Sequence, residues 1–430
     1  MAQLWDLGVR GSTLDVVAAW KEALVLIALL LVAWNVRRLP AVVAADLLAL
    51  SYAAVIVLYW LLPQDSLGGE ATSRGELLAL RHHLFPVAAY VLGRLIAIAW
   101  QERGRVGGLV VLSAVVVAVV GLLDLAFVSL QAWRDSGVPG WFAEQLGLDY
   151  EGLSGLPENW VYNTGDEDNP IRRLVSTFLS PLASAYVLVI ALIYVVSRPV
   201  RWWWCLAAAL LFGALLYTHT RAALAALALG LVLLAVAQRR VLPAVAAVVA
   251  VAVSAVFLAA YPSIGPSTSY TPEELVWLRA NAAEEGGISG GRFPPVEDES
   301  TESHWTSLRD GVRTVLRHPQ GYGLGNAGVV AKRTGVDIKA GESTYTEIGV
   351  DAGIAGVAAF VLWNLAILVG LWRREAPWVT AAFAAVLALA LQTDVIGVHW
   401  LAFTVWLAAG LALGLPRRSA EPSEDEPAAP

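Results

Sequence analysis

Residues 221–260 read RAALAALALGLVLLAVAQRRVLPAVAAVVAVAVSAVFLAA. Two almost purely apolar runs lie on either side of the pair Arg239-Arg240. A helix needs about 20 apolar residues to cross the hydrocarbon core of a bilayer, and each run approaches that length. Because every backbone amide and carbonyl group must be paired inside lipid, such runs form helices. The segment therefore predicts two membrane-spanning helices joined by a short basic turn.

The composition of the whole chain agrees with this interpretation. Of its 430 residues, 57% are hydrophobic and 15% are charged, and the mean hydropathy is +0.62. Soluble domains are nearer to half apolar and a quarter charged. The composition excludes a cytosolic enzyme, a disordered scaffold and a nucleic-acid-binding module. The single cysteine, Cys205, excludes a disulfide framework and a cysteine-based metal site.

The predicted fold class is all-α: a polytopic helical membrane protein with about 11–12 transmembrane helices and a large outer loop that carries short helices. We expect a single transmembrane domain over residues 1–415. Eleven apolar stretches account for its spans: approximately 17–36, 41–62, 80–100, 106–130, 174–196, 202–217, 221–238, 241–260, 345–372, 377–393 and 396–415.

Basic pairs in alternate connections predict the orientation. The positive-inside rule places these connections in the cytoplasm. The outer face then carries the amino terminus and two long loops, 131–172 and 261–344. Residues 416–430 are acidic and Pro-rich and predict a disordered cytoplasmic tail. The basic pairs are Arg37/Arg38, Arg103/Arg105, Arg198/Arg201, Arg239/Arg240, Arg373/Arg374 and Arg417/Arg418.

Few charged residues fall inside the predicted spans. Arg94 and Asp124 are costly in lipid unless they are paired, and they lie on adjacent spans, so they are a possible pair. His82 and His83 lie near the outer end of the third span and could face a common cavity.

The second outer loop contains a predicted amphipathic helix that ends before Pro319. Arg309, Arg313 and Arg317 stand four residues apart and therefore line one side of this helix. Two interpretations stay open. The guanidinium groups can hold a phosphate or diphosphate bidentately, or the helix lies in the membrane interface and its arginines meet lipid headgroups. The apolar residues at helical spacing are Trp305, Leu308, Val312, Val315 and Leu316.

Three motifs follow one another between residues 170 and 372. The first is RLVSTFLSP at 173–181, and the second is YTHTRAA at 217–223. The third combines His318-Pro319, GYGLG at 321–325, ESTY at 342–345 and GIAG at 353–356. Together and in this order they resemble the O-antigen ligase and polysaccharide polymerase superfamily.

The resemblance implies an integral membrane glycosyltransferase of the GT-C type. Such enzymes move a glycan from an undecaprenyl-diphosphate carrier to an acceptor hydroxyl on the outer face of the bacterial cell membrane, without a metal or another cofactor. The implied partners are this donor, a glycan or lipid acceptor, and membrane lipids. Whether the chain is a polymerase or a ligase stays open. The alternative function is a transporter or flippase for a lipid-linked sugar or an anionic substrate.

Arginines are the predicted diphosphate-binding residues, because the departing diphosphate needs positive charge where its own charge develops. Arg221 is the first candidate, since it lies at the outer start of a helix, where backbone dipoles also favour anions. Arg173 is the next, and Arg172 beside it could do the same. Arg292 and Arg309 both suit the loop arginine of the ligases. The full candidate set is Arg173, Arg221, Arg292, Arg309, Arg172 and Arg313.

The predicted catalytic residues are Glu342 and His304. Ligases of the family carry a His, thought to activate the acceptor, where this chain has Glu342. A carboxylate can act as a base when burial raises its pKa. His304 is the alternative base, since its placement ahead of the loop helix resembles polymerase-like members. A salt bridge between Glu342 and a loop arginine is a further alternative.

Overall fold

The computed structural model describes residues 2–11, 13–14, 17, 19–36, 41–100, 105–163, 170–284 and 296–415. Each of the eleven predicted stretches contains a helix. These helices are α3 (Trp20–Asn35), α4 (Ala44–Leu61), α6 (Ser73–Trp100), α7 (Arg105–Phe127), α10 (Pro181–Ser197), α11 (Trp202–Tyr217), α12 (Arg221–Gln238), α13 (Val241–Ile264), α17 (Thr344–Arg373), α18 (Pro377–Leu389) and α19 (His399–Gly414).

The shorter elements lie mainly at one end of the bundle. They are α1 (Ala2–Asp6), α5 (Gln64–Leu67), α8 (Leu130–Arg134), α9 (Val138–Gly140), η1 (Trp141–Gln145), η2 (Glu151–Leu153), η3 (Glu158–Trp160), β1 (Val161–Tyr162), β2 (Ile171–Arg172), η4 (Ser176–Phe178), α14 (Pro272–Glu284), α15 (Val296–Arg317) and α16 (Gly328–Thr334). The strands β1 and β2 form one small antiparallel ribbon.

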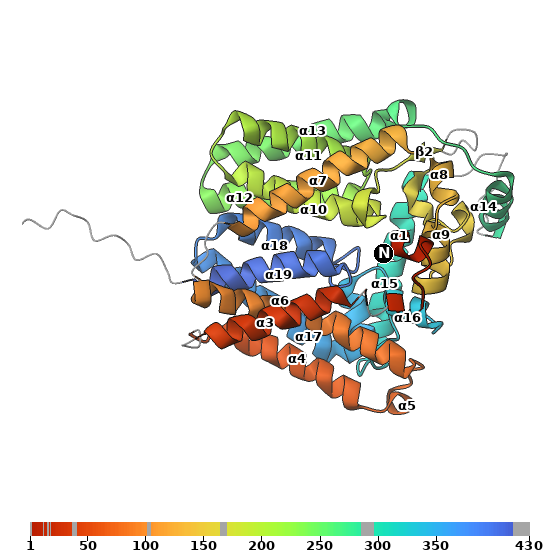
Figure 1. Cartoon of the computed structure of the whole chain (residues 1–430). Helices are drawn as coiled ribbons and strands as arrows, with labels where there is room; N and C mark the ends of the chain where they lie inside the picture. The colour runs from red at the N-terminus through yellow and green to blue at the C-terminus, as the bar shows by residue number, and fades with distance from the viewer. Residues whose placement is uncertain are drawn as a thin grey trace, which may run out of the picture.

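The protein is a polytopic all-α membrane protein. Among the described residues, six helices (α4, α6, α7, α12, α13 and α17) are long and apolar enough to cross a membrane, and α10, α11, α18 and α19 are shorter apolar helices. In Figure 1, α7 and α10–α13 form one half of the bundle, and α3, α4, α6, α17 and α19 form the other, with α18 packed against both α12 and α17.

Small residues let the two most closely packed helices approach. A Cβ atom on Gly93 of α6 would lie 2.2 Å from the carbonyl oxygen of Leu407 in α19. A Cβ atom on Gly410 of α19 would lie 2.1 Å from the carbonyl oxygen of Tyr90 in α6. Such small-residue contacts replace the hydrophobic driving force that helices lack inside lipid.

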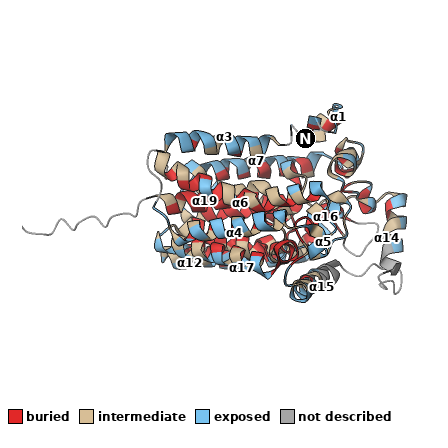
Figure 2. Cartoon of the chain, turned by 90° about the horizontal axis from the view of Figure 1, so that it is seen from below, coloured by how far each residue is buried: buried red, intermediate tan, exposed pale blue. Residues whose placement is uncertain are grey.

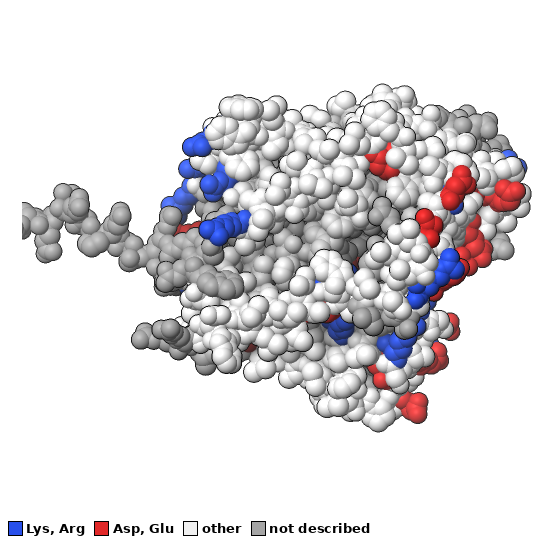
Figure 3. Space-filling model, viewed as in Figure 1, with Lys and Arg blue, Asp and Glu red and all other residues white. Residues whose placement is uncertain are grey.

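Charged side chains are distributed unevenly along the bundle. Figure 3 shows mainly basic side chains at the left end of the helices, and acidic side chains together with several basic ones at the right. Three of the predicted basic pairs, at 198/201, 239/240 and 373/374, fall in the described connections. Arg37, Arg38, Arg103, Arg417, Arg418 and the tail 416–430 lie outside the described residues.

Two expectations about the spans are wrong. The fifth span was expected from residue 174, but α10 begins at Pro181, because Ser180 caps it by accepting a hydrogen bond from the Ala183 amide. Arg94 pairs with Asp46 rather than Asp124, at 2.8 Å between Nη2 and Oδ2.

The first long outer loop folds into a compact unit rather than an open connection. Short helices and the β1–β2 ribbon enclose a small apolar core. Phe142, Leu156 and Trp160 are buried in this core. Val175, which follows β2, packs with them. This unit holds the strand β2 and the residues after it against the bundle.

A kink in α17 brings the Gly-rich segment to the bundle. The helix breaks at Ala352 and at Gly353, whose φ of 62° and ψ of −170° suit glycine almost alone. The Ile354 amide donates a hydrogen bond to the Pro319 carbonyl at 2.9 Å. The residues that follow α15 are therefore fixed against the bend of α17.

Gly353→Ala should unfold this region. The new Cβ atom would lie 2.5 Å from the Pro319 carbonyl oxygen, and the backbone strain alone costs about 1–3 kcal/mol. We expect a clear fall in the midpoint of thermal unfolding, measured on detergent-solubilised protein by size-exclusion chromatography. Gly108→Ala is the control, since a Cβ atom there meets nothing within 4 Å. Equal midpoints for the two variants would show that the kink is not strained.

Candidate functional site

Two of the predicted motifs meet at the end of the bundle opposite the basic connections. Arg173, just after β2, donates from Nε to the Thr218 carbonyl at 2.9 Å and from Nη2 to the Thr220 hydroxyl at 3.2 Å. The Leu174 amide donates to the Tyr217 carbonyl at 2.9 Å. These bonds fix Arg173 on the turn between α11 and α12, directly before Arg221.

Arg173 and Arg221 form a concentration of positive charge. Burial lowers the pKa of Arg173 to about 10, and the charge of Arg221 contributes to this shift. Arg173 therefore remains protonated at neutral pH. Among the described residues its hydrogen-bond partners are a carbonyl and a hydroxyl group, neither of which neutralises its charge. Because guanidinium groups bind phosphate oxygens strongly, this pair is a candidate anion-binding site.

His219 lies beside this arginine pair and was missed at the sequence level. Its ring packs between Tyr162 and Tyr261, at centroid distances of 4.3 and 4.5 Å. The side chain is buried, and its Nε2 atom has no hydrogen-bond partner among the described residues. Burial, followed by the charges of Arg173 and Arg221, lowers its pKa to about 3, so the imidazole is neutral. The Thr218–Arg221 motif did not indicate this residue, because His219 occupies the motif position at which any residue is allowed.

His304 and Glu342 form a hydrogen-bonded pair. His304 comes from α15 and Glu342 from the turn before α17, and the Nδ1–Oε2 distance is 2.7 Å. Their side chains are 46% and 45% exposed, so both can be reached by a substrate. Glu342 has a φ of 68°, an unfavourable conformation for a residue with a side chain. Such strain is common at functional sites.

The pair shifts the titration of both its members. The hydrogen bond to Glu342 raises the pKa of His304, against the opposing effects of burial and of the Arg221 charge. The hydrogen bond from His304 lowers the pKa of Glu342, which is therefore an ionised acceptor. The charge of Arg221 acts to lower the pKa of both His219 and His304, so Arg221 lies within electrostatic reach of each of them.

Residues 206–361 match the family model described as O-Antigen ligase. The predicted resemblance to the O-antigen ligase-like superfamily is thereby confirmed, and it supports a membrane enzyme of glycan transfer. No curated protein matches the chain significantly. The matched segment contains Arg221, His304 and Glu342, whereas Arg172 and Arg173 lie before it.

Of the other predicted arginines, three lie among the described residues. Arg172 is buried and forms an ion pair with Asp124, at 3.1 Å between Nη2 and Oδ2. Arg309 is exposed on α15. Arg313 is exposed as well and pairs with Asp310 at 3.0 Å. Arg292 lies outside the described residues.

The Gly-rich motif is held to α17 by a buried carboxylate. Asp351 accepts hydrogen bonds from the amides of Gly325 and Asn326 through Oδ1, at 3.2 and 3.1 Å. Its other oxygen meets Nε2 of His83 at 3.0 Å, and Nδ1 of His83 meets the Tyr52 hydroxyl at 3.2 Å. His83 therefore holds Asp351 in position, and Asp351 in turn binds the Gly-rich motif.

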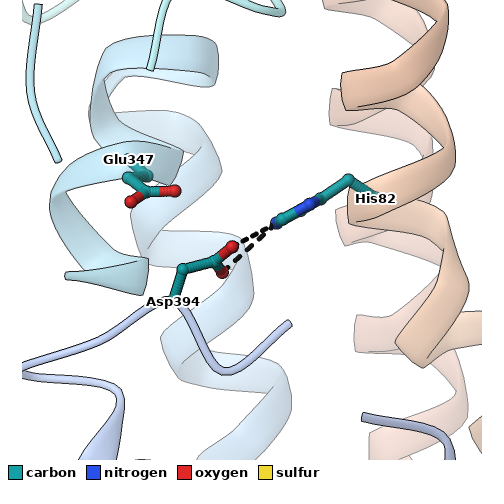
Figure 4. Close-up of side chains that lie close together, drawn as sticks. All are labelled: His82, Glu347 and Asp394. Carbon is teal, nitrogen blue, oxygen red and sulfur yellow. Dashed lines mark hydrogen bonds and ion pairs between the residues drawn. The ribbon is translucent and has the colours of Figure 1, made fainter. Parts of the chain in front are cut away.

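One group of three among the described residues could hold a metal ion. His82, Glu347 and Asp394 place their potential ligand atoms within 4.8 Å of one another. Figure 4 shows the imidazole of His82 on α6 directed at the Asp394 carboxylate, with Glu347 of α17 beside it. His82 Nε2 lies 3.2 Å from both Asp394 oxygens. A direct hydrogen bond therefore already connects two members of the group.

His219→Phe should leave the protein equally stable or more stable. The substitution keeps the aromatic packing and removes a buried nitrogen that has no partner, which costs about 1–3 kcal/mol. Thermal unfolding in detergent measures the change. Tyr261→Phe is the control, since it removes a hydroxyl that donates to the Arg172 carbonyl at 2.6 Å, and it should lower the midpoint. A fall with His219→Phe as large as the control's would mean that Nε2 has a partner.

Proposed function

We propose that this protein is a glycosyltransferase that moves a glycan from an undecaprenyl-diphosphate carrier to an acceptor hydroxyl. The observation that supports the proposal is that the charge of Arg221 reaches both Arg173 and the hydrogen-bonded His304–Glu342 pair. A diphosphate leaving group needs fixed cations, and an acceptor hydroxyl needs a base. The site offers both, and the O-antigen ligase match supports the same reaction class.

Arg173 and Arg221 would bind the diphosphate of the donor. Guanidinium groups stay charged and match phosphate oxygens in a bidentate geometry, so they supply the positive charge for which other enzymes use a metal. Arg173 is pre-positioned by Thr218 and Thr220, which lowers the cost of ordering it on binding. The neutral His219 adds an uncharged hydrogen-bonding atom next to this pair.

His304 would be the base and Glu342 the residue that orients it. Since Nδ1 of His304 donates to Glu342, Nε2 on the other side of the ring can accept a proton. The acceptor O–H bond breaks as its proton moves to Nε2, and the oxygen forms a bond to the anomeric carbon. The bond from that carbon to the diphosphate breaks, and the diphosphate leaves with the electron pair. The base in this proposal is therefore the imidazole of His304 on α15. In the family's ligases, the histidine occupies the position that Glu342 has in this chain.

The site would lie on the outer side of a bacterial cell membrane. The basic connections gather at the opposite end of the bundle, and such connections stay in the cytoplasm. The arginine pair, at the start of α12, and Glu342, before α17, therefore face the extracytoplasmic side, where a lipid-linked donor and its acceptor meet. Arg292, Arg309 and Arg313 are not required by this proposal.

A transporter or flippase is the second candidate function. Such proteins place their substrate site near the bilayer midplane. The proposed site lies at helix ends instead, which favours the enzyme. Extracting lipids from producing cells separates the remaining possibilities. A lengthened glycan that stays on the carrier indicates a polymerase, and a glycan that moves to another lipid indicates a ligase.

Arg221→Ala should reduce glycan transfer by about 100- to 1,000-fold, as the loss of one group that stabilises developing charge does elsewhere. Arg173→Ala, His304→Ala and Glu342→Ala should also reduce it strongly, and His219→Phe more mildly. The assay follows glycan products on gels, with membranes that contain the protein and a polyprenyl-diphosphate-linked glycan, in the presence of EDTA.

Arg239→Ala is the matched control, since this exposed arginine lies at the basic end of the bundle. It should keep wild-type transfer. Wild-type activity of both Arg221→Ala and Glu342→Ala would refute the proposed site. Loss of wild-type activity in EDTA, restored by a divalent cation, would refute the metal-free chemistry.

The rate of transfer should rise with pH through the pKa of His304. The neutral imidazole is the active form, and the hydrogen bond to Glu342 raises this pKa above its usual value. Glu342→Gln removes the negative charge that stabilises the protonated imidazole, so the acid limb of the pH–rate profile should move to lower pH. Initial rates of both proteins across the acid and neutral range measure the shift. An acid limb that stays in place would assign it to another group.

A further inference from the structure

We infer that α15 is seated in the headgroup region of the outer leaflet, where its arginines bind anionic phospholipids. We term one side of this helix the exposed face of α15. Lipid binding by this face does not depend on the proposed reaction. The exposed face consists of Trp305, Arg309, Val312, Arg313 and Leu316.

Large apolar side chains on this face are open to the surroundings. Trp305 is 67% exposed, Leu316 66% and Val312 44%. At 100° per residue, positions 305, 309, 312 and 316 fall on one stripe of the helix. An exposed stripe that mixes aromatic, aliphatic and arginine side chains is the pattern of an interfacial helix.

The opposite side of α15 is occupied by the protein. A Cβ atom on Gly311 would lie 2.9 Å from Cβ of Thr346, and one on Gly349 would lie 2.5 Å from Val315. His304 also lies on this side, where it meets Glu342. The helix is therefore fixed in rotation, and the exposed face points away from the bundle.

The position of α15 along the bundle matches the membrane boundary. The 20 residues of α17 from Ile354 to Arg373 span about 30 Å, the thickness of the hydrocarbon core. Arg373 lies at the basic end, so Ile354 lies at the outer boundary of the core. Because the Ile354 amide bonds the Pro319 carbonyl, the carboxyl end of α15 lies at this same boundary.

The spanning part of α17 also has an exposed apolar side. Its residues Ile354, Leu362, Leu365 and Val369 are 45–52% exposed and share one side of the helix. Figure 1 shows α15 running across the direction of the spanning helices, and Figure 2 places it at the margin of the bundle. A helix at this depth, lying across the spans and outside them, meets the headgroups rather than open water.

The charges of the face select the partner. Arg309 and Arg313 alternate with the apolar side chains. Arg313 has Asp310 as an exposed ion partner, a contact that contributes little in water and can exchange for a phosphate. Arginine near a membrane surface is attracted to anionic lipid. Phosphatidylglycerol-type headgroups offer both the net charge and the phosphate oxygens.

The test labels the full-length protein at single cysteines. Cys205→Ser removes the native thiol, and Val312→Cys then carries a polarity-sensitive fluorophore. Asp310→Cys is the matched control, since Asp310 is exposed on α15 but lies about 160° from Val312 around the helix. The proteins are reconstituted in phosphatidylcholine vesicles, with or without phosphatidylglycerol, and probed with spin-labelled lipids and with aqueous iodide.

We expect the label at position 312 to emit at shorter wavelength than the label at 310. Spin-labelled lipid should quench it at least about twofold more than it quenches the control, as for a residue below the headgroups. Iodide should show the reverse order. Equal quenching of both labels by iodide, without lipid quenching at 312, would overturn the inference.

The lipid charge is tested separately. Phosphatidylglycerol should increase lipid quenching at position 312, and the double substitution Arg309→Gln and Arg313→Gln should abolish this increase. Quenching by lipid that is equal with and without phosphatidylglycerol would overturn the assignment of an anionic partner. The comparison of vesicles with and without phosphatidylglycerol uses the protein without the two Arg→Gln substitutions. It therefore remains valid even if the double variant does not assemble.

Discussion

A charge inside a bilayer must be paired, and this constraint organises the interior of the protein. Arg94 is held by Asp46 through two hydrogen bonds, at 3.0 and 2.8 Å. Arg172 is held by Asp124 through a single contact, at 3.1 Å between Nη2 and Oδ2. These pairs connect α6 to α4, and β2 to α7, so they fix the outer unit to the bundle as well as satisfying the charges. Removing one partner of such a pair would leave a buried charge without compensation, which is strongly destabilising.

Arg173 departs from this pattern, and the proposed diphosphate site depends on the departure. Its neighbour in sequence, Arg172, is neutralised by a carboxylate, whereas Arg173 bonds to a carbonyl and a hydroxyl group. The side chain is equally well positioned but keeps its net charge. A protein that needs an anion site close to a membrane gains it by holding an arginine with neutral partners. The unpaired Nε2 of His219 is a second local cost in the same region.

If α15 lies in the headgroup region as we infer, it connects the proposed site to the lipid. On one side of α15, His304 forms a hydrogen bond with Glu342. On the other side, Trp305 and Leu316 are exposed. Contact with the membrane on one side would therefore hold the imidazole in register on the other. The kink at Gly353 serves the same arrangement, since it brings the end of α15 against α17 at the membrane boundary.

The sequence by itself determined the all-α membrane class, the approximate location of each apolar helix and the superfamily, because these depend on local hydropathy and on short motifs. It also singled out Arg221, His304 and Glu342. Only the tertiary structure decided which of these residues meet. His304 and Glu342 are 38 positions apart, and hydropathy carries no information about contacts over that separation. The partner of Arg94, the start of α10 and the role of His219 likewise depend on which side of a helix or turn faces which neighbour. That choice is made by packing between helices, which a single sequence does not encode in any local pattern.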